Sequence, residues 1–172
     1  IVAALVYPPL KYRVGGDAVI FIAYTFTPLF ATAWIVTGTW SLDSIWAVLP
    51  TGILTVGILH ANNLRDAQTD TQAGIRTLAS VLGQKWSVWL YQFEMLAPFA
   101  ILLATVWLGI LPMSVLLALP VAVTVMTLCK QALRFDGVNT ASIATLDAST
   151  AKTQLMFSML MVLGLVAGHW VV

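Results

Sequence analysis

Long apolar runs separated by short polar segments dominate the chain. Five runs approach the ~20 residues that a helix needs to cross a bilayer, and they cover about residues 18–38, 44 to beyond 60, 86–109, 113–129 and 153 to the C-terminus. Residues 1–7 have the pattern of the last turns of a further helix. The chain is therefore predicted to be an all-α, polytopic transmembrane bundle: five whole spans plus the end of another, in one membrane-embedded domain.

Composition supports a membrane protein and narrows its partners. The chain is 60% hydrophobic and 9% charged, whereas a soluble domain carries about 25% charged residues. The net charge is +1 and no basic stripe is present, so nucleic acid is not expected as a partner. The single Cys129 excludes an intrachain disulfide, and no zinc-site spacing occurs.

The basic residues predict the orientation of the helices. They fall only in alternate connecting segments, and the turns around Asp43 and Gly109 have none. The positive-inside rule therefore places the basic loops in the cytoplasm and the C-terminus on the opposite side. The longest polar segment, residues 134–151, is predicted to be a loop with at most a short surface helix, in which Asp136 and Asp147 are solvated. The basic residues, in loop order, are Lys11 and Arg13; Arg65, Arg76 and Lys85; Lys130, Arg134 and Lys152.

The second span carries the chemically suggestive residues. Between Pro50 and Gln72 there is no further proline, so we predict one helix over residues 44–72, about 40 Å long at 1.5 Å per residue. That is longer than the roughly 30 Å hydrocarbon core. Residues four apart share a helix face, so Asn62, Asp66 and Asp70 should form one stripe. Gly74 is well placed to end the helix.

Two readings of this stripe remain open from the residues alone. Mg²⁺ is commonly held by one or two carboxylates plus substrate phosphates, and the forked donors of Arg65 and Arg76 would suit phosphate oxygens. This reading gives a Mg²⁺–diphosphate site at the cytoplasmic membrane surface. The alternative is a solvated helix end whose charges set topology, which the common D-x-x-x-D spacing by itself favours. An EF-hand is excluded because its alternating acidic pattern is absent.

A longer match favours the first reading. Residues 60–83, HANNLRDAQTDTQAGIRTLASVLG, resemble the second aspartate motif of the UbiA superfamily of intramembrane prenyltransferases. The form looks most like the 1,4-dihydroxy-2-naphthoate prenyltransferases of menaquinone synthesis and their vertebrate relatives. Residues 7–16, YPPLKYRVGG, and residues 147–155, DASTAKTQL, resemble the family's loop before helix five and its entry into the last helix.

The resemblance implies a fold and an activity. Members have nine helices, so this chain would correspond to helices four to nine and lack the first motif, N-x-x-x-D. We therefore expect N-terminal helices to be missing here or to lie on a companion chain, and we do not expect this chain alone to catalyse. The implied reaction is Mg²⁺-dependent transfer of a polyprenyl group from its allylic diphosphate to an aromatic quinone precursor, 1,4-dihydroxy-2-naphthoate, with decarboxylation.

The same resemblance assigns roles to individual residues. Asp66 and Asp70 would be the catalytic carboxylates that hold Mg²⁺. The diphosphate would be bound by the cationic and amide side chains of this region, namely Arg65, Arg76, Lys11, Asn62 and Asn63.

Three further residues have open assignments. Glu94 lies inside the third span, where a carboxylate suggests function, here near the acceptor; the alternative is a residue paired with Lys85 or a loop arginine. Tyr7 could roof the acceptor site, although interfacial anchoring is the commoner role. His60 is expected to be a packed, hydrogen-bonded residue rather than a base.

Other functions make different predictions. A non-catalytic, prenyltransferase-like subunit could serve as a scaffold in a larger complex, and the absent first motif motivates that alternative. It is decided by whether upstream helices, or a companion chain, carry N-x-x-x-D in a cytoplasmic loop. A transporter would place its binding residues near mid-membrane, whereas these charges gather at one surface. We expect an integral protein of a bacterial inner membrane or its equivalent.

Overall fold

The computed structural model describes residues 14–39, 42 and 44–170, with only the backbone of Trp170. This part of the chain is all-helical and contains five helices long and apolar enough to cross a membrane, which confirms the predicted fold class. Residues 1–7 lie outside the described part. The elements are α2 (Gly16–Phe21), η1 (Ile22–Phe26), α3 (Thr27–Thr37), α4 (Ile45–Gln72), α5 (Leu78–Trp107), η2 (Met113–Val121), α6 (Ala122–Leu133), η3 (Thr140–Ile143) and α7 (Leu146–Trp170).

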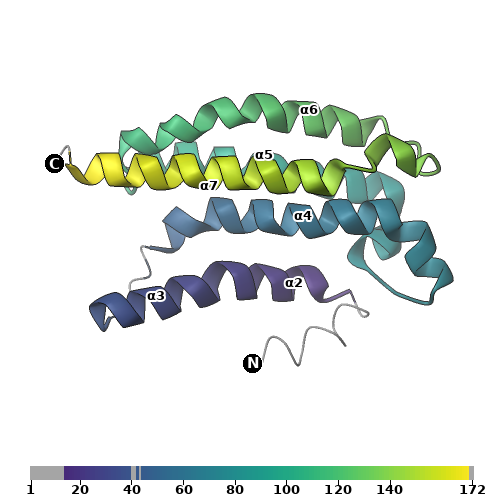
Figure 1. Cartoon of the computed structure of the whole chain (residues 1–172), viewed down its shortest axis with the longest axis horizontal. Helices are drawn as coiled ribbons and strands as arrows, with labels where there is room; N and C mark the ends of the chain where they lie inside the picture. The colour runs from purple at the N-terminus through teal and green to yellow at the C-terminus, as the bar shows by residue number, and fades with distance from the viewer. Residues whose placement is uncertain (1–13, 40–41, 43, 171–172) are drawn as a thin grey trace.

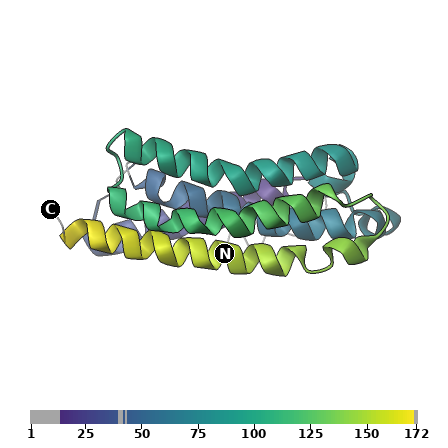
Figure 2. The same ribbon diagram turned by 90° about the horizontal axis from the view of Figure 1, so that it is seen from above.

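The long helices run side by side in an up-and-down bundle (Figures 1 and 2). Helix α4 packs against α2, α5 and α7, while α7 also packs against η2 and α6. The interior is filled by large side chains such as Tyr91, Met95 and Phe157, all fully buried. Large apolar side chains such as Phe93 and Val123 are exposed on the outside, as expected of an integral membrane protein whose outer face meets lipid.

The first span bends where its sequence requires it. Elements α2, η1 and α3 form one apolar span, Gly16–Thr37, and η1 is a π-helical turn. Pro28 follows directly and has no N–H to donate, so a regular α-helical bond is lost there. The Thr27 hydroxyl donates a hydrogen bond to the Ile22 carbonyl oxygen, 3.3 Å away, in this irregular turn.

Two helices begin earlier than the hydropathy predicts. Helix α5 starts at Leu78, where the Thr77 hydroxyl caps the Ser80 N–H. Gly83 then breaks the α-helical geometry with φ of 72°, so a short turn precedes the apolar span. Helix α7 starts at Leu146 rather than near residue 153, because its first polar side chains are satisfied inside the bundle: the Thr150 hydroxyl donates to the Leu146 carbonyl and lies 2.7 Å from the Tyr91 hydroxyl.

Candidate functional site

The polar stripe lies near the end of α4. The helix is continuous from Ile45 to Gln72, so Asn62, Asp66 and Asp70 lie on one face as predicted. Its end is a Schellman motif: the Gly74 N–H donates to the Thr71 carbonyl at 3.1 Å and the Ile75 N–H to the Asp70 carbonyl at 2.8 Å. Gly74 has φ of +75°, a conformation that glycine adopts without strain, and it ends the helix as expected.

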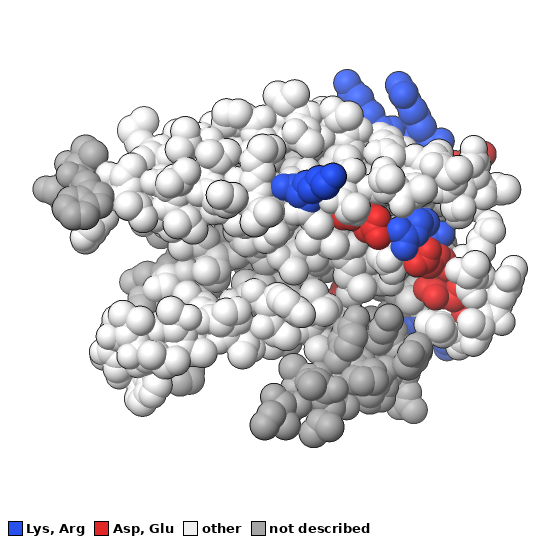
Figure 3. All heavy atoms as spheres, viewed as in Figure 1, with Lys and Arg blue, Asp and Glu red and all other residues white. Residues whose placement is uncertain are grey.

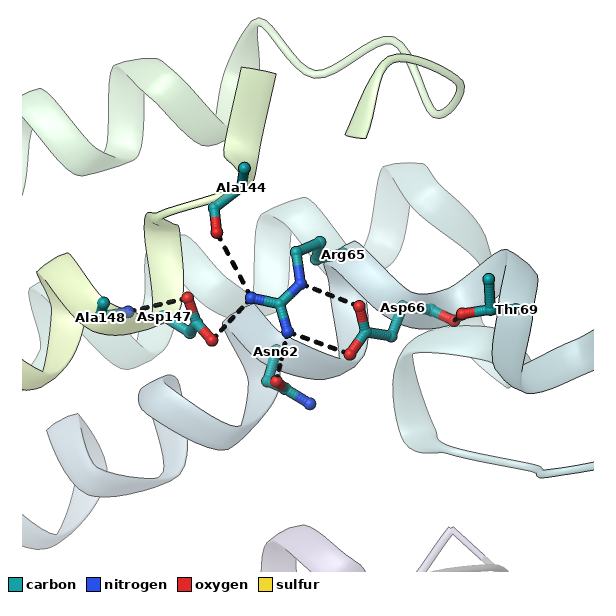
Figure 4. A network of polar contacts seen from close by, with 7 residues as sticks. All are labelled: Asn62, Arg65, Asp66, Thr69, Ala144, Asp147 and Ala148. Atoms are coloured by element: carbon teal, nitrogen blue, oxygen red, sulfur yellow. Dashed lines mark hydrogen bonds and ion pairs between the residues drawn. The ribbon is translucent and has the colours of Figure 1, made fainter. Parts of the chain in front are cut away.

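Charged side chains gather toward the end of the bundle where α4 passes to α5 and α6 passes to α7 (Figure 3). Within this region, Arg65 is the centre of a hydrogen-bonded network (Figure 4). Its Nε and Nη2 donate to the two carboxylate oxygens of Asp66, at 2.8 and 3.1 Å. Its Nη2 also donates to Asn62 Oδ1 at 2.6 Å. Its Nη1 donates to Asp147 Oδ2 at 2.7 Å and to the Ala144 carbonyl at 3.4 Å.

This network corrects the expected role of Asp147 and refines that of Arg65. Asp147 is not a solvated loop charge, because it lies in the first turn of α7 and pairs with Arg65. Arg65, expected to contact a diphosphate, has five hydrogen bonds to protein groups, which matches the five N–H donors of a guanidinium. Both oxygens of Asp66 are therefore engaged by a cation on the same helix.

The remaining predicted residues separate in space. Asn63 is 5% exposed and faces the core, away from its neighbour Asn62. Arg76 is exposed on the α4–α5 linker, where its backbone carbonyl accepts a hydrogen bond from the Val14 N–H at 2.9 Å. Lys11 and Tyr7 lie outside the described residues. The structure thus joins Asn62, Arg65 and Asp66, and adds Asp147, which hydropathy could not reveal. A local signal existed, since Asp147 opens the quoted DASTAKTQL segment.

Among the cavities at this end, two lie against different faces of α4. One, of about 310 Å³, is lined by Ile20, Tyr24, Thr55, Ile58, Leu59, Asn62 and Asp147. Ile58 and Asn62 precede Asp66 and Asp70 at intervals of four residues, so this mainly apolar cavity continues the carboxylate row.

The second cavity, of about 570 Å³, lies on the other face of α4 and includes Gln68, Gln84 and loop residues 135–138. There the Asp136 carboxylate accepts hydrogen bonds from the Asn139 and Val138 N–H groups, which lower its pKa. Asp136 therefore organises the loop before α7. Arg65 lines the same cavity, but its five hydrogen bonds go to other groups.

Glu94 and His60 form a separate buried pair. His60 is fully buried and Glu94 is 5% exposed. His60 Nε2 lies 3.0 Å from the Ser87 carbonyl oxygen and 2.8 Å from the Ser87 hydroxyl, while its Nδ1 lies 3.8 Å from Glu94 Oε1. His60 is thus the packed, hydrogen-bonded residue that was predicted. The titratable neighbours of Glu94 are this histidine and the buried Asp17, and not Lys85 as the alternative reading had it.

The donor set at the stripe fits Mg²⁺ only in part. Asp66 and Asp70 supply the hard carboxylate oxygens that Mg²⁺ prefers. Within the described ranges, however, no three His, Cys, Asp or Glu side chains come together as a metal centre. Mg²⁺ often keeps waters and completes its shell with substrate phosphates, so two carboxylates on one face suit half of a metal–diphosphate site.

Comparison with known proteins agrees with this arrangement. Residues 1–160 match the UbiA prenyltransferase family. The chain belongs to this family. Relatives named "UbiA prenyltransferase domain-containing protein 1" are 34% identical in Mus musculus and 33% identical in Homo sapiens, each over 162 residues. These alignments cover 91% of this chain and 44% of each relative. The protein of the same name in Gallus gallus is 42% identical over 94 residues, which cover 53% of this chain and 27% of that protein.

Family membership is therefore established over most of this chain, while the chain spans less than half the length of the relatives aligned over 162 residues. No solved structure matches the chain. The substrates and the activity of the whole protein are matters for a proposal.

Proposed function

We propose that this chain is part of an enzyme that transfers a polyprenyl group from an allylic diphosphate to an aromatic quinone precursor. The observation that carries the proposal is the single row formed by Ile58, Asn62, Asp66 and Asp70 on α4. It joins a carboxylate pair to a mainly apolar cavity. A polyprenyl diphosphate has the same division between a charged head and an apolar tail.

The carboxylate end of the row would bind the head group. Asp66 and Asp70 would hold Mg²⁺, which when bound would neutralise charge on the departing diphosphate. Asn62, with Asn63 behind it in the core, would support the head group from α4. Arg76 on the linker and Lys11 in the preceding loop would supply further cations, and Arg65 fixes the Asp66 carboxylate.

The apolar end of the row would hold the tail and the reacting carbon. Ile58 and Leu59 line the cavity below Asn62, where they would exclude water from a developing allylic cation. The C–O bond to the diphosphate breaks and the leaving group keeps the electron pair. The aromatic ring then forms the new C–C bond. For 1,4-dihydroxy-2-naphthoate, the acceptor that we propose, the ring carboxylate leaves as CO₂ and its electron pair restores aromaticity.

The acceptor would be held deeper in the bundle. Glu94 is a buried carboxyl that has His60 beside it and a second buried carboxyl, Asp17, within electrostatic range, and a buried carboxyl can bind a phenolic hydroxyl. Tyr7 would roof the site from the loop before α2. We place the carboxylate end of the bundle in the cytoplasm, following the positive-inside rule. The first motif, N-x-x-x-D, would come from helices upstream of residue 1 or from a companion chain.

The proposal is tested by a prenyl transfer assay on the intact protein in membranes, with Mg²⁺, 1,4-dihydroxy-2-naphthoate and a polyprenyl diphosphate. We expect Asp66→Asn and Asp70→Asn each to lower kcat/KM by at least about 100-fold, because each removes a metal-binding charge at constant shape. Chelation of Mg²⁺ should abolish turnover. Asp136→Asn is the matched control, since it removes an acid from the neighbouring loop and should leave the rate unchanged.

Two outcomes would contradict the proposal. Activity that persists in both aspartate variants would remove the metal assignment. Absence of activity in an intact protein whose upstream region, and any companion chain, lacks N-x-x-x-D would instead support the alternative, a prenyltransferase-like scaffold subunit.

A further inference from the structure

Asp147 connects the last helix to the carboxylate row. Its Oδ2 accepts from Arg65 Nη1 at 2.7 Å, and its Oδ1 accepts from the Ala148 N–H at 2.8 Å. Both oxygens are thus occupied, one by α4 and one by the first turn of α7. Arg65 in turn meets both oxygens of Asp66. A chain of charge-assisted hydrogen bonds therefore runs from α7 through one guanidinium to the Asp66 carboxylate (Figure 4).

We propose that Asp147 is a positioning residue for Asp66: it anchors Arg65, and through Arg65 it determines how readily the Asp66 carboxylate is released to a divalent metal. The inference rests on the proposed function of the row. It concerns Asp147, which the motif on α4 does not contain, and it assigns to the start of α7 a role in metal binding.

The direction of the effect follows from competition for one guanidinium. A metal that binds Asp66 must take at least one carboxylate oxygen from Arg65, because both oxygens are engaged. Asp147 and the Ala144 carbonyl hold the other side of the same guanidinium. Removing the charge of Asp147 leaves Arg65 with Asp66 as its one anionic partner in this network. Arg65 should then hold Asp66 more tightly, and the metal should bind more weakly.

The ion pair is poorly suited to a purely structural role. The Arg65 and Asp147 side chains are 25% and 23% exposed, and partly exposed ion pairs contribute little to stability. Helix α7 is held to the bundle by other contacts, including the Thr150 hydroxyl against Tyr91 and the Ser114 hydroxyl against the Gly164 carbonyl. Loss of the Asp147 charge should therefore leave the fold intact.

The test is metal binding measured without turnover. Mn²⁺ is titrated into the purified intact protein in detergent with inorganic pyrophosphate present, and free Mn²⁺ is followed by electron paramagnetic resonance. We expect Asp147→Asn to raise the Kd roughly three- to tenfold, which lies in the lower part of the range of coupling between groups in one network. Asp147→Glu, which keeps the charge, should stay within about twofold of wild type. Asp136→Asn should not change the Kd, and all variants should keep the thermal unfolding midpoint.

A second background makes the test specific to the proposed route. In Arg65→Gln protein, Asp147→Asn should have no further effect on the Kd, because the intermediary is gone. An unchanged Kd in Asp147→Asn would overturn the inference, and so would an equal effect of this substitution in the Arg65→Gln background. In either case, Mn²⁺ binding that depends on Asp66 would still support the proposed function of the row. Absence of any Asp66-dependent Mn²⁺ binding in wild type would overturn both.

Discussion

The Ser87 carbonyl oxygen decides which nitrogen of the His60 ring carries the proton. The Ser87 carbonyl can only accept a hydrogen bond, so His60 Nε2, 3.0 Å away, carries the proton. Nδ1 of the neutral ring then presents a lone pair toward Glu94 Oε1, 3.8 Å away. At 3.8 Å these two atoms are beyond hydrogen-bonding distance, so Nδ1 is a buried acceptor that has no hydrogen bond in the structure.

Two substitutions of Glu94 can distinguish its contribution to stability from a contribution to activity. Glu94→Ala should lower the free energy of unfolding by about 2–4 kcal/mol, because it removes buried side-chain volume beside His60. Glu94→Gln should stay within about 1 kcal/mol of wild type, since its amide can donate to Nδ1. If the carboxyl serves the acceptor, Glu94→Gln should still lower kcat at least about tenfold. Denaturant titration in micelles and the prenyl transfer assay provide the two measurements.

The control for this pair is Leu96→Ala, on the same helix but 41% exposed, which should change neither quantity appreciably. A Glu94→Gln variant of full activity would show that Glu94 is a structural residue.

At the residue scale, the sequence predicted which residues share a helix face, but it did not predict contacts between residues far apart in the chain. The intervals between Asn62, Asp66 and Asp70 predict a shared face because helix geometry relates residues four apart. The Arg65–Asp147 pair joins residues 82 positions apart. No periodicity relates them, and Asp147 consequently looked like a solvated loop charge.

At the element scale, close helix packing depends on small residues. A Cβ built on Gly164 of α7 would lie 2.6 Å from the Ser114 carbonyl oxygen and from Val115 Cα of η2. Both are backbone atoms, so the neighbour cannot rotate away. We predict that Gly164→Ala lowers the free energy of unfolding by about 1–3 kcal/mol, the usual effect of overpacking, measured by denaturant titration in micelles.

The neighbouring Leu163 provides the control, because its side chain is 55% exposed. Leu163→Ala should change stability by less than about 0.5 kcal/mol. Equal stability of the Gly164→Ala variant and wild type would mean that α7 and η2 can separate freely, contrary to the packing described.

The presence of the five long helices was predictable from hydropathy, whereas the first residues of two of them were not. Apolar runs identify the part of each helix that spans the hydrocarbon region, and all five were found. The first turns of α5 and α7 are polar, and their side chains are satisfied by capping and by contacts inside the bundle. Because those contacts join different helices, a hydropathy scan places the starts near residues 86 and 153 rather than at Leu78 and Leu146.

At the scale of the whole molecule, charge distinguishes the two ends of the bundle. The described Lys and Arg residues belong to the ends of α4 and α6, the starts of α5 and α7 and the α4–α5 linker. In the up-and-down arrangement these positions fall toward one end, where acidic side chains gather as well (Figure 3). Asp66 and Asp70, near the end of α4, and Asp147, in the first turn of α7, belong to that end. The opposite end, where α5 passes to η2, has no Lys or Arg between residues 86 and 129. Under the proposed function, orientation in the membrane therefore decides which compartment supplies the diphosphate.

The orientation can be measured with two matched cysteines. Met113 and Val138 are 75% and 74% exposed and lie at opposite ends of the bundle, while the native Cys129 is 4% exposed and should react little. In a bacterial host, a membrane-impermeant maleimide added to intact cells should label Met113→Cys. Val138→Cys should be labelled only after permeabilisation, because the basic loops are retained in the cytoplasm. The reverse pattern would place the Asp66 row outside the cell and contradict a cytoplasmic diphosphate site.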